Sequence, residues 1–265
     1  IRQAPNSDTP RRMPTADMPE GPSIVILREE AAQFEGKIVR GVAGNSTLDL
    51  SRMEGCRVES LRSWGKHFLI EFADFSMRVH LMLFGSYRID DPKPAPARMS
   101  LSFDNGDLHF YNCSLRYIEV PLDQAYDWSA DVMSDQWDPK AARAKLKAKP
   151  DMPACDALLD QSIFAGSGNI IKNEVLFRIR VHPCSRVGAL PARKLTQLIT
   201  EVRNYSFEFL EWKKAFVLRK HWLVHTKTEC PRGHGRLTKA HLGATRRRSF
   251  FCETCQVLYG AESGE

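Results

Sequence analysis

Residues 158–174 read Leu-Leu-Asp-Gln-Ser-Ile-Phe-Ala-Gly-Ser-Gly-Asn-Ile-Ile-Lys-Asn-Glu and join two helical segments through a Gly-x-Gly-Asn turn. The glycines Gly166 and Gly168 permit tight turns and let another backbone approach closely. Backbone amides at the N-terminus of the second helix attract an anion. A dinucleotide-binding loop is the competing interpretation, but it needs a third glycine, a preceding strand and a βαβ unit, which are absent here. The stretch therefore predicts two helices joined by an anion-attracting turn.

Helical periodicity surrounds this turn on both sides. Asp138-Pro139 is typical of a helix start, with an aspartate N-cap followed by proline at the first helical position. Helical patterning continues through Leu159, resumes near residues 170–177 and returns over residues 191–212, where apolar side chains share one face. The second half of the chain is therefore predicted to be α-helical.

The first half follows a different pattern. A helix is predicted over residues 22–36, and alternating apolar positions over residues 68–72 and 77–89 predict strands. Asn105-Gly106 lies between two further alternating runs and predicts a β-hairpin, because both central residues of the favoured two-residue turn need positive φ. We expect an α+β multidomain protein in which an antiparallel β domain precedes a helical domain.

Near the C-terminus, Cys230-Pro-Arg-Gly-His234 is followed by Cys252-Glu-Thr-Cys255. Two short ligand pairs separated by an insert of hairpin length suit tetrahedral Zn²⁺, which binds thiolate sulfur and imidazole nitrogen readily. Four protein ligands leave no position for a reactive water, so one structural zinc ion is predicted, holding together a short ribbon. His241 remains an alternative to His234 as the fourth ligand.

Positive charge is concentrated around this predicted metal site. The 265 residues carry a net charge of +6, yet residues 213–248 hold eleven Lys or Arg against the single acid Glu229. Three of these cations, Arg246, Arg247 and Arg248, lie just before Cys252. Guanidinium groups on a rigid hairpin are suited to phosphate oxygens, so the basic block indicates a polyanionic partner.

Composition excludes several other classes of protein. No apolar run reaches the roughly 18 residues that a membrane helix needs, and residues 1–17 contain no apolar stretch of a secretory signal. Seven cysteines are sparse, and the closest pair has metal-ligand spacing. We therefore expect a cytoplasmic protein that does not bind a membrane. Residues 1–18 are predicted to be a disordered or non-native extension.

Together these motifs resemble the formamidopyrimidine-DNA glycosylase/endonuclease VIII family of DNA repair enzymes. The matching pieces occur in the family's order and are Met18-Pro-Glu-Gly-Pro22, Gly65-Lys66, the 158–169 stretch and the zinc ribbon with Arg247. The resemblance implies an N-terminal β-sandwich with flanking helices over residues 19–130, a helix–two-turns–helix domain over 131–225 and a zinc finger over 226–260. It also implies a monomer with damaged DNA in the cleft between the domains.

The resemblance further implies a bifunctional DNA glycosylase and AP lyase of base excision repair, in which particular residues have particular roles. Pro19, once Met18 is removed, resembles the amine nucleophile that attacks C1′ and forms a Schiff base, and the strand is nicked by β,δ-elimination. Glu20 resembles the acid that assists sugar opening. Lys66 resembles the lysine that contacts phosphate and the damaged site. Asn169 and Arg247 resemble the pair that clamps phosphates around the flipped nucleotide, and Arg247 also serves the second elimination.

The loop Met82-Leu83-Phe84 follows a predicted strand at the position where the family fills the gap left by an extruded base. Three apolar residues on one loop resemble the endonuclease VIII branch and imply oxidised pyrimidines as substrates. An 8-oxoguanine or formamidopyrimidine glycosylase is the alternative within the family. A non-catalytic module that binds damaged DNA is the alternative if Pro19 stays blocked.

Three features depart from the family pattern. Ser23 stands where a second acid is common in the opening motif, and the first ligand pair is Cys-x₃-His where Cys-x₂-Cys is usual. In addition, seventeen residues precede Met18, and a proline inside a chain has no free amine to offer.

Overall fold

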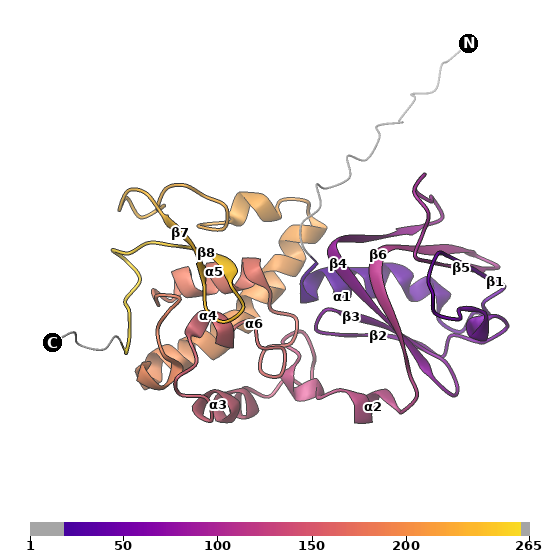
Figure 1. Ribbon diagram of the computed structural model, residues 1–265, viewed down its shortest axis with the longest axis horizontal. Helices are drawn as coiled ribbons and strands as arrows, with labels where there is room; N and C mark the ends of the chain where they lie inside the picture. The colour runs from indigo at the N-terminus through magenta and orange to yellow at the C-terminus, as the bar shows by residue number, and fades with distance from the viewer. Residues whose placement is uncertain (1–18, 261–265) are drawn as a thin grey trace, which may run out of the picture.

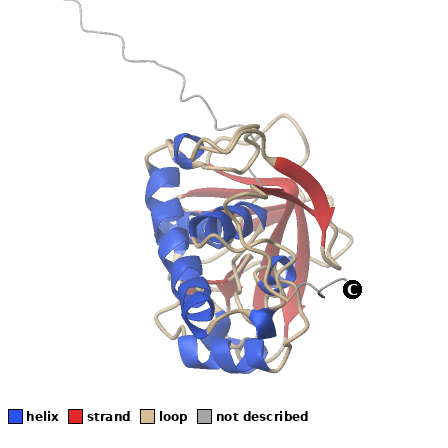
Figure 2. Cartoon of the chain, turned by 90° about the vertical axis from the view of Figure 1, so that its left-hand side faces the viewer, coloured by secondary structure: helices blue, strands red, loops and turns tan. Residues whose placement is uncertain are grey.

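The computed structural model describes residues 19–260, which form a β-rich part and a helical part (Figure 1). The extension predicted over residues 1–18 lies outside the described residues. Figure 2 shows the helices gathered on one side and the strands of the large sheet on the other. Within residues 19–260, no helix is both long and apolar enough to cross a membrane.

The β-rich part is one antiparallel sheet that folds over itself. Along the chain, α1 (Gly21–Ala31) and the 3-10 turn η1 (Ala32–Phe34) precede the first strand of this sheet. A second 3-10 turn, η2 (Ser51–Met53), lies between the first and second strands. The strand order is β1-β5-β6-β4-β3-β2. The bounds of these strands are β1 Gly41–Ala43, β2 Ser60–Trp64, β3 His67–Glu71, β4 Ser76–Ile89, β5 Met99–Phe103 and β6 Gly106–Ile118.

The long strands β4 and β6 belong to both halves of the sheet, which makes the predicted sandwich. One end of β4 pairs with β3, whereas the N-terminal end of β6 pairs with β5. Phe68 on β3 therefore meets Phe110 on β6, with ring centroids 5.8 Å apart, inside an apolar core shared with α1. The expected β-sandwich architecture is confirmed.

The hairpin at Asn105-Gly106 forms, but its turn differs from the prediction. Phe103 pairs with Gly106, so Asp104 and Asn105 are the central turn residues. Neither of them has positive φ, and Gly106 has φ 142°. The conformational freedom of glycine is therefore used at the first residue of the returning strand rather than inside the turn.

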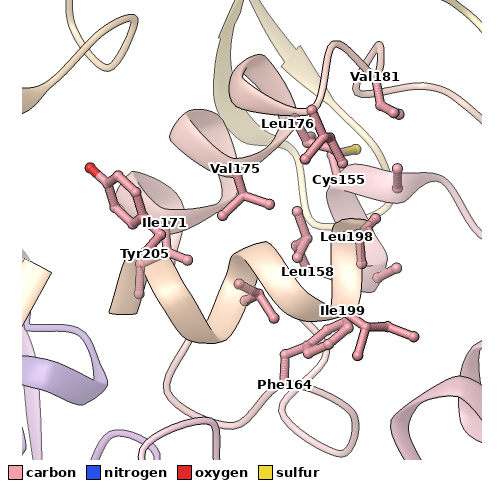
Figure 3. Packing of buried hydrophobic residues seen from close by; sticks show 14 of the residues in the cluster. Cys155, Leu158, Phe164, Ile171, Val175, Leu176, Val181, Leu198, Ile199 and Tyr205 are labelled. Carbon is pink, nitrogen blue, oxygen red and sulfur yellow. The ribbon is translucent and has the colours of Figure 1, made fainter. Parts of the chain in front are cut away.

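The helical part ends in the ribbon, and the helices predicted near residues 170–177 and over 191–212 form as α5 and α6. The helix predicted from Asp138 through Leu159 is interrupted: α3 ends at Lys147, α4 covers only Ala154–Ala157, and residues 158–168 form turns. Asp138 caps α3 by accepting a hydrogen bond from the Lys140 amide, as its sequence indicates. Figure 3 shows Ile171 and Val175 of α5 together with Leu198 and Ile199 of α6 in one buried apolar cluster. The elements are α2 (Leu122–Ala125), η3 (Trp128–Ala130), α3 (Pro139–Lys147), α4 (Ala154–Ala157), α5 (Asn169–Arg178), η4 (Val187–Ala189), α6 (Ala192–Lys214), η5 (Leu218–His221), β7 (Thr238–Leu242) and β8 (Arg247–Phe251).

Glycine backbones bring the two parts together. The Gly21 amide donates a 2.8 Å hydrogen bond to the Gly166 carbonyl. A Cβ on Gly21 would lie 2.9 Å from the Gly166 Cα, and a Cβ on Gly65 would lie 2.9 Å from the Gly166 nitrogen. Real Cβ atoms do not approach so closely, so the start of α1, the β2–β3 turn and the turn before α5 meet only because these residues lack side chains.

Candidate active site

A cleft of about 430 Å³ lies where these three segments meet. Seven of the eight residues predicted to act on or bind the substrate line it, namely Pro19, Glu20, Lys66, Met82, Leu83, Asn169 and Arg247. Phe84 lines a neighbouring hollow, into which Leu83, Asn169 and Arg247 also reach. Residues more than 200 positions apart in the sequence thus share one cavity wall.

Glu20 is the N-cap residue of α1, yet its carboxylate caps the other helix of the site. Its oxygens accept hydrogen bonds from the amides of Gly168 (3.1 Å), Ile170 (2.7 Å) and Ile171 (3.2 Å) at the start of α5. Because a Cβ on Gly168 would lie 2.5 Å from the Glu20 Cδ, only glycine admits the carboxylate there. The anion that attracts the α5 amides in this chain is therefore its own glutamate.

Opposing effects act on the protonation of Glu20. Burial, the largest effect, raises the pKa of Glu20, while Lys66 and the three α5 amides lower it. The net direction is upward. A carboxyl group with a raised pKa is suited to give and take a proton near neutral pH.

Lys66 follows Gly65 in the β2–β3 turn, and a hydrogen bond to Asp131 of the helical part stabilises this turn. The Gly65 amide donates a 3.1 Å hydrogen bond to Oδ2 of Asp131, and Gly65 has φ 53°. Burial, the largest effect, lowers the pKa of Lys66, the negative charge of Glu20 raises it, and the positive charge of Arg247 lowers it further. The charges of both Glu20 and Arg247 therefore act on Lys66.

Asn169 and Arg247 approach the cleft from two different elements. Asn169 is the first residue of α5 and is 8% exposed, and its Oδ1 has no hydrogen-bond partner within residues 19–260. Arg247 is the first residue of β8 and is exposed. Both residues line the cleft and the adjacent hollow, so their polar groups face the same open space.

The loop Met82–Phe84 interrupts the pairing of β4 with β6 and stands out from the sheet. The register shifts between Leu81 and Ser86, and Phe84 has φ 64°. The three side chains are 47%, 50% and 63% exposed. The Asn112 side chain donates a 2.6 Å hydrogen bond to the Leu83 carbonyl and supports the loop. Exposed apolar side chains at the mouth of a polar cleft are typical of a surface that binds an apolar or aromatic group of a partner.

The cleft also contains residues to which the sequence analysis gave no catalytic, DNA-binding or metal-binding role. They are Trp64, His67, His80, Leu81, Leu159, Gln161, Gly168 and Thr245. His67 and His80 face each other across β3 and β4, with ring centroids 5.1 Å apart. Burial, followed by the charge of Arg78, lowers the pKa of His67 to about 3, so its ring is neutral. The only signal for these two histidines in the sequence is that His67 follows Lys66 and that His80 lies two residues before Met82.

Four residues of the ribbon gather as potential metal ligands. One ligand atom from each of Cys230, His234, Cys252 and Cys255 lies within 4.8 Å of the others. The Cys230 sulfur is 3.6 Å from His234 Nδ1 and 3.9 Å from the Cys255 sulfur. A tetrahedral ion with metal–sulfur bonds of about 2.3 Å places its ligand atoms about 3.8 Å apart, so the set fits such an ion.

The fourth ligand in this set is His234 rather than His241. His241 lies on β7, and its Nδ1 is 2.9 Å from the Arg246 carbonyl. The structure thus gathers His234, and not His241, with the three cysteines.

Two family profiles match this chain. Residues 18–117 match the formamidopyrimidine-DNA glycosylase N-terminal domain, and residues 129–216 match the formamidopyrimidine-DNA glycosylase H2TH domain. The first match begins at Met18, one residue before Pro19.

Curated relatives share about three residues in ten with this chain. DNA-(apurinic or apyrimidinic site) lyase Nei2 of Mycolicibacterium smegmatis is 30% identical over 91% of this chain and 99% of its own length. Human endonuclease 8-like 2 is 31% identical over 92% of this chain and 77% of its own length. Endonuclease 8-like 3 of Xenopus laevis is 30% identical over 80% of this chain, which spans only 36% of that longer protein.

Solved structures share the fold at lower identity. A viral DNA glycosylase superposes with a TM-score of 0.79 at 18% identity, covering 90% of this chain and all of the other. The Lactococcus lactis formamidopyrimidine-DNA glycosylase, non-covalently bound to DNA containing an AP site, superposes with a TM-score of 0.78 at 21% identity, covering 89% of this chain and 99% of the other.

Proposed function

Because this chain belongs to the formamidopyrimidine-DNA glycosylase/endonuclease VIII family, we propose that it is a bifunctional DNA glycosylase and AP lyase of base excision repair. The observation that carries the proposal is the cleft that Pro19, Glu20, Lys66, Asn169 and Arg247 line together. The relatives named endonuclease 8-like and Nei2 support the same activity. Damaged DNA is the proposed partner, and the basic block around Arg247 supplies its electrostatic attraction.

Pro19 is the proposed nucleophile. A free α-amine with a pKa near 8 is about one-tenth deprotonated at pH 7, far more than an ordinary lysine. The proline nitrogen donates its lone pair to C1′ of the damaged nucleotide as the bond from C1′ to the base breaks. A secondary amine then gives an iminium ion when the sugar ring opens. The iminium accepts electrons and drives the two eliminations that nick the strand.

Glu20 and Lys66 are proposed to have different roles next to Pro19: Glu20 donates a proton and Lys66 contacts a phosphate. The raised pKa of Glu20 suits it to protonate the ring oxygen of the sugar as the ring opens. Lys66, which lines the same cleft as Glu20, contacts the phosphate of the damaged nucleotide. Asn169 and Arg247, which line the same cleft, hold the flanking phosphates.

The exposed loop Met82–Phe84 favours oxidised pyrimidines as the substrate class. Its three apolar side chains project from one loop and are available to fill the gap left by the extruded base, which offsets stacking losses of a few kcal/mol. This arrangement resembles the endonuclease VIII branch.

Excision from matched duplexes tests the proposal. The chain that starts at Pro19 is mixed with duplexes containing thymine glycol, 5-hydroxycytosine or 8-oxoguanine, and single-turnover rates are measured. We expect faster release of both pyrimidines than of 8-oxoguanine. Faster release of 8-oxoguanine would favour the purine-lesion alternative, and release of none of the three bases would contradict the glycosylase assignment.

We propose that Cys230, His234, Cys252 and Cys255 hold one structural Zn²⁺. Three thiolates and one imidazole at tetrahedral spacing are the donors that zinc prefers. All four positions come from protein, so the ion would stabilise the ribbon that carries Arg247 rather than take part in the reaction.

Cys252→Ser is expected to lose zinc and most DNA affinity together, because the ribbon loses its fold along with its metal. Arg247→Ala is the matched variant, since it changes the ribbon without touching a ligand. It should retain one zinc per chain and still bind DNA more weakly. Metal analysis and titration of abasic-site duplex give both quantities. Wild-type protein without zinc, purified without chelators, would contradict the assignment.

A further inference from the structure

Lys172 is a fully buried lysine whose charge lowers the stability of the fold, and it has no role in the chemistry described above. It lies on α5, three residues after Asn169, and is 0% exposed. Its ammonium donates hydrogen bonds to the Arg248 carbonyl (3.1 Å) and the Ser249 hydroxyl (2.9 Å). Within residues 19–260, no carboxylate pairs with it. A buried charge bonded only to neutral acceptors costs stability, so its presence calls for an explanation.

The partners of Lys172 are the two residues that follow Arg247 on β8. Burial lowers the pKa of Lys172 to about 8, so the group keeps its proton at neutral pH. The adjacent Asn173 also holds this strand, because its Oδ1 accepts a hydrogen bond from the Phe250 amide (3.3 Å). Figure 1 shows β8 lying next to α5. Successive residues of one helix thus fix the strand that begins with Arg247.

Helical periodicity explains how α5 can both present Asn169 to the cleft and bind β8, the strand that carries Arg247. Residues at positions i, i+3 and i+4 lie on one face of a helix. Asn169, Lys172 and Asn173 have this spacing, so the turn of α5 that presents Asn169 to the cleft also binds β8. The register of Arg247 relative to Asn169 is therefore set by Lys172 over a single helical turn.

The far end of the hairpin has a second anchor. Asp156 of α4 accepts hydrogen bonds from the amides of Ala244 (2.8 Å) and Thr245 (3.3 Å) and from the Thr245 hydroxyl (3.0 Å). These residues belong to the β7–β8 turn. Arg247 thus lies between a turn held by Asp156 and a strand held by Lys172, and its backbone is fixed from both sides.

We propose that Lys172 is a positioning residue that sets the Arg247 guanidinium against the same DNA backbone that Asn169 contacts. The inference rests on the proposed function, because it takes Arg247 to bind a phosphate. Lys172 itself is buried and touches no DNA. Its effect on binding must therefore pass through Arg247, which makes the two residues energetically coupled.

A double-mutant cycle with Lys172→Met and Arg247→Ala tests this coupling. Methionine has a similar shape but donates no hydrogen bond. Dissociation constants are measured for a duplex with a non-cleavable tetrahydrofuran abasic analogue. We expect Lys172→Met to weaken binding by about threefold to thirtyfold. In the Arg247→Ala background the same substitution should change binding by less than about twofold. A purely structural role would instead weaken both backgrounds equally.

Lys194→Met is the matched control. Lys194 is on α6 in the same helical part, and its ammonium also donates to a backbone carbonyl, that of Ile179. This variant should bind like wild type. If Lys172→Met loses zinc or unfolds, Ser249→Ala replaces it in the same cycle, because it removes the hydroxyl that accepts a hydrogen bond from the Lys172 ammonium.

The outcomes separate this inference from the proposed function. Unchanged binding by Lys172→Met, or equal losses in both backgrounds, would overturn the positioning role while Arg247→Ala still weakens binding. Wild-type protein that does not prefer the abasic analogue to undamaged duplex would instead count against the proposed function. For the chain that starts at Pro19, the share of product from the second elimination should also fall in Lys172→Met, as in Arg247→Ala.

Discussion

The chain that begins at Pro19 will give a borohydride-trapped adduct with abasic-site DNA, whereas the chain carrying residues 1–18 will give none above background. When Met18 precedes Pro19, the proline nitrogen is an amide whose lone pair is delocalised into the carbonyl, so it cannot form an iminium ion. Binding should survive, because Lys66, Asn169 and Arg247 are present in both chains. Gel analysis of trapped adducts and a binding titration measure the two effects.

A chain that retains only Met18 is the matched control for this comparison. It blocks the nitrogen without the bulk of the longer extension, and it should also fail to be trapped. Intact mass must show that each extension is still present during the assay. Equal trapping by the extended and trimmed chains, or an adduct that maps to Lys66, would show that Pro19 is not the nucleophile. A trimmed chain that binds damaged DNA without cleaving it would favour the non-catalytic module.

Glu20→Gln is expected to slow excision of thymine glycol by about 10²-fold to 10⁴-fold, the range typical of losing a positioned general acid. The glutamine has nearly the same shape but carries no exchangeable acid proton. Its carbonyl oxygen keeps one acceptor for the α5 amides, which bind the glutamate in wild type. Single-turnover rates on the same duplex give the effect.

A preformed abasic site separates chemistry from misfolding in this variant. The abasic sugar equilibrates with its open aldehyde, so Pro19 reaches the carbonyl without an acid to open the ring. Borohydride trapping on abasic DNA by Glu20→Gln should therefore fall far less than its excision of thymine glycol. Equal losses on both substrates would contradict the role of Glu20 as the acid and indicate a structural defect at the start of α5.

Much of the site could be predicted from the sequence because its signals are local. The Cys-x₃-His and Cys-x₂-Cys pairs, the Asp138-Pro139 helix start and the Gly-x-Gly-Asn turn each depend on residues a few positions apart. Short-range geometry of this kind is set by backbone sterics and ligand spacing. The family resemblance added the order of these motifs along the chain, which no single motif carries.

The tertiary structure decided contacts between distant segments. The sequence indicates that the α5 amides attract an anion, but only packing shows that this anion is Glu20, 150 residues away from Ile170. It also gathers His234 rather than His241 with the three cysteines, and it bonds Lys172 to the two residues that follow Arg247. Such contacts depend on how the sheet and the helices pack, and a residue's neighbours in sequence carry no record of that packing. The sequence thus determined which groups this protein has, and the packed fold determined which of them meet.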